Sequence, residues 1–576
     1  MLVFQVEPRV RRVEHGTYEH VFRVATGCCY RLADGEVQDK ETVVLRNSQE
    51  WRQWIIAHRS PRRCTWIYSY GLVYGLTLLD AWRGWSRDGE QVVSAVLSDP
   101  PSIVLTRRSR CVSKYVDAAN YARDGLRTLA RAAGTPCPSP MSCGSTDDAV
   151  IAYSTFKTCT VGDLICQWIS LVRSRRLCGW QPTATQLSFA SLRHSFLAGP
   201  IAIHAHVEAT SLERAALHGG RVQMWRSGCV GEPVTIVDVN SLYPAVMRDY
   251  PHPVKFRSHQ WGGTVRELAQ ALSGYECVAA VGIAQSRLDL PRRVGRAVYW
   301  DGVQGVRYLA GAELRQASAL GCVKRVHALA RYDAGFPFTR FVDGLFPLKV
   351  SLIKEKKYGQ AALVKMLLNG LHGKFAQHGR RWQDCPAALS QGIWTTWWGR
   401  DSTDGAVVPC RDVGGCTQRC TQAGEWRHSF PGLSASIASA ARVVLARARD
   451  VAGVAQTLYC DTDSLHLIGD GPDRMATGDL LHPADLGKWK VAATGSDAHY
   501  WGLKHYRVGS KYCCCYLTAS AWGIADGVYR DAARIHFGRL LDEGLHDAVY
   551  YRERIVRTRE RDQGERMEVI DYGDFA

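Results

Sequence analysis

The chain lacks the features of a membrane, repeat or disordered protein. Its 576 residues contain no apolar run of membrane-spanning length, no internal repeat and no low-complexity tract. These absences exclude a helical membrane protein, a solenoid and a long disordered linker. The apolar run within Met1–Val13 is too short for a secretory signal. We therefore expect a cytoplasmic protein with no membrane partner, in the host cytoplasm if a virus encodes it.

Acidic residues are the minority charge. The sequence has 55 Asp and Glu against 72 Lys and Arg, a formal net charge of +17. Such an excess favours a polyanionic partner held by contacts that weaken with salt. Charge alone leaves open a generally basic surface without a dedicated groove. The length predicts three or more folded units, and 46% hydrophobic with 22% charged residues indicates a globular chain.

Nothing marks the 20 cysteines as a disulfide framework, because a cytosolic protein keeps its thiols reduced. Cys410, Cys416 and Cys420, with His428 beyond them, form a candidate zinc group. Their gaps miss the usual paired spacing, so zinc stays open. The run Cys513–Cys515 is more typical of a strand, in which adjacent side chains face opposite sides.

Two carboxylates stand one residue apart in Tyr459–Ser464, at Asp461 and Asp463. A third, Asp238, follows the β-prone run Val234–Val237 and therefore lies at the end of a predicted strand. An extended segment would turn Asp461 and Asp463 to the same side, whereas a tight turn would splay them. An isolated Asp-Thr-Asp is more often an Asx turn. Together, the two motifs predict a site that holds two divalent metal ions for phosphoryl transfer.

The order of these motifs resembles that of family B DNA polymerases, in the protein-primed branch found in phages and linear plasmids. Asp238–Pro244 is similar to motif A, Tyr459–Ser464 to motif C and Lys365–Phe375 to motif B. The resemblance implies an α/β (α+β) fold, in which a ribonuclease-H-like exonuclease-type domain precedes a palm-fingers-thumb right hand with an antiparallel palm sheet. The implied division is 1–190 (exonuclease-like), 191–250 (palm), 251–340 (first insertion), 341–380 (fingers), 381–430 (second insertion), 431–510 (palm) and 511–576 (thumb).

The resemblance also implies roles for the acidic residues. Two Mg²⁺ ions, for which Mn²⁺ can substitute, would lie between Asp238 and Asp463, with the carbonyl of Val239 as a further ligand. Asp461 would be a shared ligand or would act on the site through a neighbour. Tyr243 would exclude ribonucleotides by meeting the 2′-hydroxyl, the group that distinguishes the two sugars. The nucleotide-binding set implied by the family is Val239, Ser241, Leu242, Tyr243, Lys354, Lys365 and Asn369.

Lys365, Asn369 and His372 share one face of a predicted helix, because their spacing of four and three residues matches the helical period. Lysines on such a face can hold a triphosphate by charge-assisted hydrogen bonds. We expect Lys365 and Lys354 to contact the phosphates, although the run Lys354–Lys357 alone is more typical of a solvated basic face. His372 departs from the tyrosine of the family motif, which leaves the packing of this helix open.

Further motifs suggest DNA contacts. Lys504-His505-Tyr506 resembles the family's Lys-x-Tyr element at the primer end, and Leu217–Arg221 resembles its Tyr-x-Gly-Gly element. The DNA-binding set implied by the resemblance is Gly219, Gly220, Arg221, Gly373, Thr462, Lys504 and Tyr506. The implied partners are a DNA primer-template, deoxynucleotides and a terminal priming protein, and we expect a monomer. Segment 251–340 would contact the priming protein, and the Trp-rich stretch Ala387–Gly424, with Trp394, Trp397 and Trp398, the template.

The three exonuclease motifs have lost their carboxylates where the resemblance places them. The degenerate positions are Arg23 and Ala25 in the first motif, Tyr70 and Tyr74 in the second, and Lys157 in the third. Without metal ligands, proofreading hydrolysis should fail. Misalignment is the alternative, with Glu14, Glu19, Asp34 or Glu36 as displaced ligands.

The scaffold of this domain still shows a folding pattern. Val43–Leu45, Trp66–Tyr70 and Leu72–Leu79 are predicted strands and Asp147–Val172 a helix, while Asp531–Tyr550 predicts a thumb helix.

The sequence predicts a template-directed DNA polymerase that works by two-metal-ion chemistry and does not proofread. Two alternatives remain. One is a degenerate protein that only binds nucleic acid, and the other is a template-independent or repair polymerase.

Overall fold

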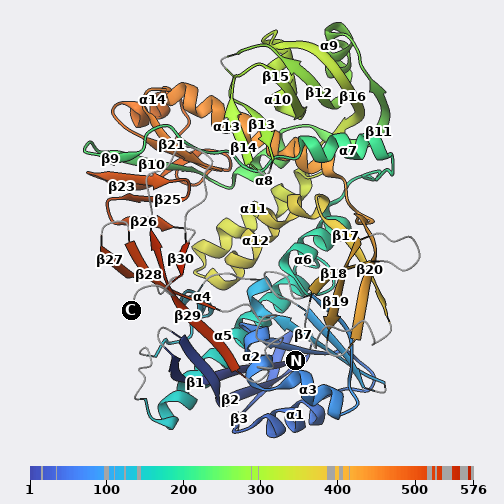
Figure 1. The fold of residues 1–576 in the computed structure, drawn as a ribbon, viewed down its shortest axis with the longest axis vertical. Helices are drawn as coiled ribbons and strands as arrows, with labels where there is room; N and C mark the ends of the chain where they lie inside the picture. Colours follow the sequence, from blue (N-terminus) through green and yellow to red (C-terminus); the bar gives the residue numbers. More distant parts are fainter. Residues whose placement is uncertain are drawn as a thin grey trace.

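The computed structural model describes the chain from Met1 to Asp571 with several gaps (Figure 1). Residues outside the description are 15–16, 34, 97–102, 109, 122–124, 139–144, 287, 296, 386–395, 401–406, 414–415, 515–521, 526–527, 535–547, 558–568 and 572–576. Among the described helices, none combines the length and the apolar character needed to cross a membrane.

The N-terminal part is built on a mixed sheet with helices packed against it, at the bottom of Figure 1. The strand β1 pairs in parallel with β4, and β4 in parallel with β7. The elements are β1 (Leu2–Glu14), β2 (Thr17–Ala33), β3 (Glu36–Leu45), α1 (Ser48–Ala57), β4 (Thr65–Ser69), α2 (Leu72–Leu78), α3 (Ala81–Arg87), β5 (Gln91–Val96), β6 (Ile103–Arg108), β7 (Cys111–Asp117), α4 (Leu126–Ala133) and α5 (Asp147–Ser174). The predicted strands at Val43–Leu45 and Trp66–Ser69 are confirmed.

The long helix α5 is the predicted Asp147–Val172 helix and is confirmed. Thr146 caps its first turn by accepting from the backbone N–H of Ala149, which satisfies one of the donors left open at a helix start. The helix packs against β1 and β2. Thr26 of β2 lies within hydrogen-bond distance of Ser154 and Thr158 in this contact.

The prediction of a strand at Leu72–Leu79 is wrong, because Leu72–Leu78 forms α2. A distant carboxylate explains the difference. Asp117, at the end of β7, accepts hydrogen bonds from the backbone N–H groups of Gly71 and Leu72. It thereby satisfies the first turn of a helix whose own sequence supplies no capping side chain.

The prediction of a thumb helix at Asp531–Tyr550 is wrong at both ends of this range, where the chain forms strands. The chain forms β28 (Val528–Arg534) and β29 (Ala548–Arg557), and residues 535–547 lie outside the description. With β27 (Trp522–Ala525) and β30 (Val569–Asp571), these strands extend the N-terminal sheet through pairing of β29 with β2. Figure 1 shows β29 reaching down to the N-terminal strands. The hydrophobic pattern of a short segment cannot predict this pairing, because β2 and β29 lie more than 500 residues apart in the sequence.

A five-stranded antiparallel sheet carries the three aspartates and runs in the order β23-β10-β22-β21-β8. The strand predicted at Val234–Val237 is confirmed within β10. The elements here are β8 (Val222–Met224), β10 (Val234–Val239), α8 (Leu242–Asp249), α13 (Pro431–Ala452), β21 (Thr457–Asp461), β22 (Ser464–Leu467), α14 (Gly471–Thr477) and β23 (Trp489–Gly495). A second sheet follows the order β26-β25-β24-β9, from β9 (Gly228–Val230), β24 (Ala498–Gly502), β25 (His505–Val508) and β26 (Lys511–Cys514). Cys513 and Cys514 lie in β26, as predicted, and Cys515 lies outside the description.

The helices α11 (Thr339–Lys354) and α12 (Tyr358–Phe375) pack against each other between this sheet and the N-terminal part (Figure 1). The connecting helices are α6 (Ala184–Ser191), the π-helical turn Leu192–Phe196 and α7 (Val207–Ala216). Segment 251–340 contains β11 (His252–Trp261), α9 (Val265–Gly274), β12 (Glu276–Ile283), β13 (Leu290–Val294), β14 (Ala297–Asp301), β15 (Gly305–Ala310), α10 (Gly311–Ala319) and β16 (Val323–Gly335). The Trp-rich stretch lies on a small antiparallel sheet of β17 (His378–Asp384), β18 (Thr396–Arg400), β19 (Val407–Val413) and β20 (Cys416–Glu425), and Trp394 lies outside the description.

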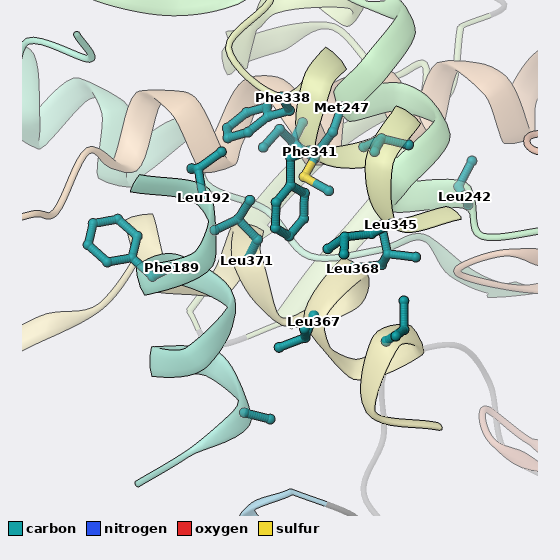
Figure 2. Close-up of a cluster of buried hydrophobic side chains, with 14 of the residues drawn as sticks. Phe189, Leu192, Leu242, Met247, Phe338, Phe341, Leu345, Leu367, Leu368 and Leu371 are labelled. Atoms are coloured by element: carbon teal, nitrogen blue, oxygen red, sulfur yellow. The ribbon is translucent and has the colours of Figure 1, made fainter. Parts of the chain in front are cut away.

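A buried apolar cluster joins α6, α8, α11 and α12 into one block (Figure 2). It includes Phe189, Leu192, Leu242, Met247, Phe338, Phe341, Leu345, Leu367, Leu368 and Leu371. Each of these side chains is at most 9% exposed, so the helices cannot shift past one another without opening a cavity. This block fixes α12 and the start of α8 beside the sheet that carries the aspartates.

Candidate active site

The three aspartates meet where β10 runs beside the β21–β22 hairpin. Asp238 lies opposite Ser464 in the β10–β22 register, and Asp461 lies opposite the same Ser464 across the hairpin. The backbone N–H of Val239 donates to the carbonyl of Asp463 at 2.9 Å. Asp463 lies in the turn itself, next to the end of β10. A tight turn therefore separates the two carboxylates of the hairpin, and only Asp463 is brought beside Asp238.

Asp238 and Asp463 form a half-buried, negatively charged pair. Burial raises the pKa of Asp463 to about 6, and the neighbouring charges of Asp238 and Asp461 raise it further. Burial also raises the pKa of Asp238, and this shift is opposed mainly by Lys490. The Oδ1 atom of Asp238 is buried, and no described residue donates a hydrogen bond to it. Two crowded carboxylates with an unmet oxygen are chemically suited to a divalent cation.

Asp461 has a different environment. The Nζ of Lys504 donates to both of its carboxylate oxygens at 2.8 Å. Lys504 adopts a left-handed conformation with φ of 58°, and its backbone N–H donates to the hydroxyl of Tyr459 at 2.8 Å. Tyr506, of the same predicted motif, packs against Tyr459 at 5.3 Å between ring centroids. In the part of the chain that the structure describes, no three His, Cys, Asp or Glu side chains are grouped as metal ligands. The candidate metal site is therefore the pair Asp238 and Asp463, with Val239 as a possible backbone ligand.

Tyr243 lies on α8, one turn after the end of β10, and its ring stacks on His372 of α12. The centroids are 4.3 Å apart and the planes 18° from parallel. Ser241, which starts α8, has a left-handed φ of 58°. The Nζ of Lys349 donates to the Ser241 hydroxyl at 3.1 Å. Helix α12 also carries Lys365 and Asn369, and thereby contains all three of the residues predicted to share one helical face.

Two lysines near the carboxylates were not found from the sequence. Lys349 of α11 is half-buried, and its pKa is lowered to about 8 by burial and by the charges of Lys365 and Lys490. Lys490 lies opposite Asp238 in the β10–β23 register. Lys354, predicted to bind phosphate, is exposed at the end of α11. It lies five residues from Lys349, about 140° around the helix, and so on a different face.

Lys356 and Lys357 lie between α11 and α12, where Lys357 pairs with Glu355 at 2.8 Å. They do not continue the helical face of Lys365. Asn369 and Gly373 are exposed on α12. Only the strand pairing places Lys490 beside Asp238, because the sequence around Lys490 resembles no known motif.

The Gly219–Arg221 segment supports the catalytic turn. The carbonyl of Arg221 accepts from the backbone N–H of Thr462 at 2.7 Å. A Cβ on Gly220 would lie 2.6 Å from Thr462 Cγ2, so only glycine allows this approach. The side chain of Arg221 is buried and pairs with Asp289 at 2.5 Å. The Arg221 side chain is therefore engaged within the protein, and its contact with DNA stays a prediction.

Arg442 of α13 hydrogen-bonds to the backbone of the segment that contains Gly219. Its Nη1 donates to the carbonyls of His218 and Gly219, both at 2.9 Å. It also makes two bonds to the carboxylate of Glu313, at 2.5 and 2.8 Å, and both side chains are nearly fully buried. His218 is buried, and burial lowers its pKa to about 3. The buried side chains of His218 and Arg221 therefore support the segment from inside, while Gly219 is exposed and its contact with DNA stays a prediction.

The exonuclease-like region contains a lysine where a metal ligand is expected. Lys157 of α5 donates to Glu7 of β1 at 2.6 Å. At the positions predicted for the first motif, Ala25 is fully buried and Arg23 pairs with Asp147 at 2.6 Å, and the assignment stays a prediction. Gln5-Val6-Glu7 of β1 also fits the Asp-x-Glu pattern, with glutamine in the place of aspartate. In that alternative the carboxylate of Glu7 is paired with Lys157.

The remaining residues of this region form ordinary contacts. Tyr74 lies 3.0 Å from the Nδ1 of His20, and Tyr70 follows the end of β4. Of the proposed displaced ligands, Glu19 lies 3.9 Å from Arg11 and Glu36 accepts from Ser170. Asp34 lies outside the description.

The candidate zinc residues lie on the small sheet of β17 to β20. Cys410 is on β19, and Cys416 and Cys420 are on β20, where Cys420 is buried. His428 packs against Trp426 instead, with centroids 4.6 Å apart. Among the described side chains, which do not include that of Cys416, no group of three His, Cys, Asp or Glu is placed to hold a metal ion.

Comparison with known proteins shows similarity to phage polymerases. Residues 180–382 match the family of DNA polymerase type B, organellar and viral. A DNA-directed DNA polymerase of Enterobacteria phage PRD1 is 26% identical over 291 residues, which cover 50% of this chain and 48% of that protein. The chain thus matches about half the length of this relative.

The fold extends the similarity over nearly the whole chain. Phi29 DNA polymerase complexed with primer-template DNA and incoming nucleotides has a TM-score of 0.68 and 14% identity, covering 97% of this chain and 100% of that one. Its binary complex with primer-template DNA has a TM-score of 0.64 and 15% identity, covering 90% and 93%. The expected fold class, α/β (α+β) with an exonuclease-type domain and a palm-fingers-thumb hand, is confirmed.

Proposed function

We propose that the chain, of which residues 180–382 match the viral and organellar type B DNA polymerases, is a template-directed DNA polymerase. It adds deoxynucleotides to a primer 3′-hydroxyl at the site of Asp238 and Asp463. The observation that carries this proposal is the pairing of these two half-buried carboxylates, of which Asp238 keeps a buried oxygen without a donor among the described residues.

The residues present fit a pair of divalent ions. Asp238 and Asp463 would hold Mg²⁺, or Mn²⁺ in its place, together with the backbone carbonyl of Val239. When bound, such ions activate the attacking hydroxyl and neutralise charge on the leaving pyrophosphate. Asp461 takes part indirectly, because its pairing with Lys504 fixes the outer side of the same turn. Lys504 and Tyr506 would receive the primer end.

The incoming nucleotide would lie between the β10 end and α12. Lys365 and Lys349 flank this space from α12 and α11, and Lys490 borders it from β23. These ammonium groups suit a triphosphate. Tyr243 would lie beneath the sugar and exclude a 2′-hydroxyl. Asn369 and Leu242 would complete the pocket.

The other parts of the chain receive their roles from the family resemblance. We propose the division into the exonuclease-like, palm, fingers, insertion and thumb segments given above, although the strands after residue 521 attach to the N-terminal sheet. Segment 251–340 is the candidate contact for a terminal priming protein. The sheet β17–β20 is the candidate contact for the template. The net charge of +17 supports DNA as the polyanionic partner.

The exonuclease-like domain would not proofread. The Lys157 ammonium lies 2.6 Å from Glu7, where it supplies the positive charge that a metal ion would otherwise bring. A fixed ammonium cannot lower the pKa of a water molecule as a metal ion does. We therefore expect a labelled primer to remain full length in Mg²⁺ without nucleotides. Progressive shortening would refute this part of the proposal.

Primer extension tests the main proposal. Asp238→Asn and Asp463→Asn should each abolish incorporation while DNA binding persists, because an amide removes the negative charge but keeps the shape. Asp470→Asn, an exposed residue that pairs only with Arg474 among its described contacts, is the matched control. Full synthesis by either site variant would overturn the assignment.

The same assay separates the alternatives. Extension with a matched template and none without it supports templated synthesis. Extension without template would indicate a terminal transferase. Binding of DNA without any extension by the unmodified protein would indicate a degenerate binding protein.

A further inference from the structure

The stacked pair of Tyr243 and His372 joins the two halves of the proposed nucleotide pocket. Tyr243 belongs to the segment that follows Asp238, and His372 lies near the end of α12. With centroids 4.3 Å apart and planes at 18°, the imidazole covers one face of the phenol ring. Because His372 covers one face of the Tyr243 ring, the ring cannot tilt toward that side. The position in which it is held then determines how much space the pocket leaves for the sugar of a nucleotide.

Both partners are anchored through their chain neighbours. Leu242, before Tyr243, and Leu371, before His372, are buried in the cluster of Figure 2. The carbonyl of His372 accepts from the hydroxyl of Ser434 at 2.6 Å, which ties the end of α12 to α13. The distance between the two rings is therefore set by the packed block and not by surface side chains.

The histidine is not the residue that packing alone would favour. Its Nδ1 is buried and has no hydrogen bond of good geometry to a described residue. Burial lowers the pKa of His372, and the backbone of Asn369 opposes this shift. A buried polar atom without a partner costs about 1–3 kcal/mol, which an apolar side chain at this position would avoid. What the imidazole supplies is a flat face nearly parallel to the phenol ring, and this points to the stack as the reason for its presence.

We propose that His372 is a positioning residue for sugar selection. It packs on one face of the Tyr243 ring and so holds this ring close to the 2′-position of the incoming nucleotide. This inference rests on the proposed polymerase function. Without the support, the phenol ring can tilt into the space of the imidazole, and a 2′-hydroxyl is then accommodated. His372 acts only through Tyr243, so its effect should vanish when the Tyr243 ring is removed.

A double-mutant cycle measures this dependence. The quantity is the discrimination ratio, kcat/KM for a deoxynucleotide divided by kcat/KM for the matching ribonucleotide in single-nucleotide primer extension. His372→Leu keeps apolar volume but removes the flat ring, and it should lower the ratio by roughly 2- to 10-fold, the factor to which aromatic stacking corresponds. His372→Phe should restore it to within about 2-fold, because it supplies a flat ring again.

The cycle is completed with Tyr243→Ala alone and with His372→Leu. The double variant should have the same ratio as Tyr243→Ala. His204→Leu is the matched control, since this imidazole also stacks on a ring, Phe256, at 4.6 Å, but lies outside the proposed pocket. Its ratio should equal that of the unmodified protein.

Several outcomes would overturn the inference alone. They are an unchanged ratio in His372→Leu, equal losses in His372→Phe and His372→Leu, or additive effects in the double variant. All three presuppose that the unmodified protein extends the primer. Failure of the unmodified protein to incorporate any nucleotide would instead refute the proposed function.

Discussion

Removal of Arg442 is predicted to destabilise the support of the catalytic turn strongly. Its guanidinium makes two bonds to Glu313 and one to each of the carbonyls of His218 and Gly219. In Arg442→Leu, the Glu313 carboxylate is left buried without its cation, which typically costs about 3–5 kcal/mol. For a folding unit of about 150–250 residues, this corresponds to a melting temperature lower by roughly 6–20 °C.

The measurement is thermal unfolding followed by tryptophan fluorescence, with primer extension at a temperature where both proteins are folded. Glu313→Gln combined with Arg442→Leu should recover part of the loss, because the buried charge disappears with its partner. Arg474→Leu, which breaks the exposed pair with Asp470, is the control and should change stability by at most about 1 kcal/mol. If Arg442→Leu cost no more than this control, the reasoning about the buried pair would be refuted.

The turn should also lose activity in Arg442→Leu beyond the loss of stability. Gly220 and the Arg221 carbonyl hold Thr462, between the two aspartates of the hairpin. Release of this segment would let Asp463 move away from Asp238. A variant that is folded at the assay temperature and fully active would show that the segment does not position the turn.

Three further predictions concern other parts of the chain. Burial lowers the pKa of His252 to about 4, so the unfolded chain takes up a proton between about pH 6.5 and 4 that the folded chain does not. This one histidine should contribute roughly 2 kcal/mol to the fall in stability from pH 7.5 to 5, beside the contributions of other buried histidines such as His218. Urea unfolding should therefore show a smaller fall in His252→Gln. Lys349→Met should raise KM for deoxynucleotides roughly tenfold if its ammonium contributes one charge-assisted bond, whereas Lys357→Met should leave KM unchanged; equal effects of both would contradict the placement of Lys349. Arg214 donates to the carbonyl of Ala376, just before β17, and to Glu425, at the end of β20, and these two points lie side by side where the chain enters and leaves the β17–β20 sheet. Arg214→Ala should therefore impair extension through a duplex more than on an open template, and equal impairment would argue against a role of this sheet in strand separation.

The parts of the site that lie on one local element were predictable from the sequence. Asp238 follows a strand because Val234–Val237 is β-prone, and Lys365 and Asn369 share a face because one helix carries both. The sequence did not determine whether the side chains of Asp461 and Asp463 face the same side, because an extended segment and a tight turn are both compatible with Tyr459–Ser464. The hairpin register decides it.

The residues that were missed or misplaced depend on pairing between distant segments. Glu7 meets Lys157 only because β1 packs on α5, and Lys490 meets Asp238 only because β23 pairs with β10. Helix α2 forms with the help of Asp117, 45 residues away from Leu72. Such contacts arise from tertiary structure, which outweighs a local preference of a few tenths of a kcal/mol per residue.

The two carboxylate sites of the chain differ in how their charge is balanced, and this difference bears on function. Glu7 is buried beside an ammonium at 2.6 Å, so it already has its counter-charge. Asp238 and Asp463 raise each other's energy, and Asp238 keeps an oxygen to which no described group donates. A folded protein retains such an arrangement at a cost in stability, which a bound divalent ion would offset. Mg²⁺ or Mn²⁺ should therefore raise the melting temperature of the unmodified protein, and this increase should be lost in Asp463→Asn but kept in Glu7→Gln. A rise that disappears in Glu7→Gln instead would place the metal in the exonuclease-like domain.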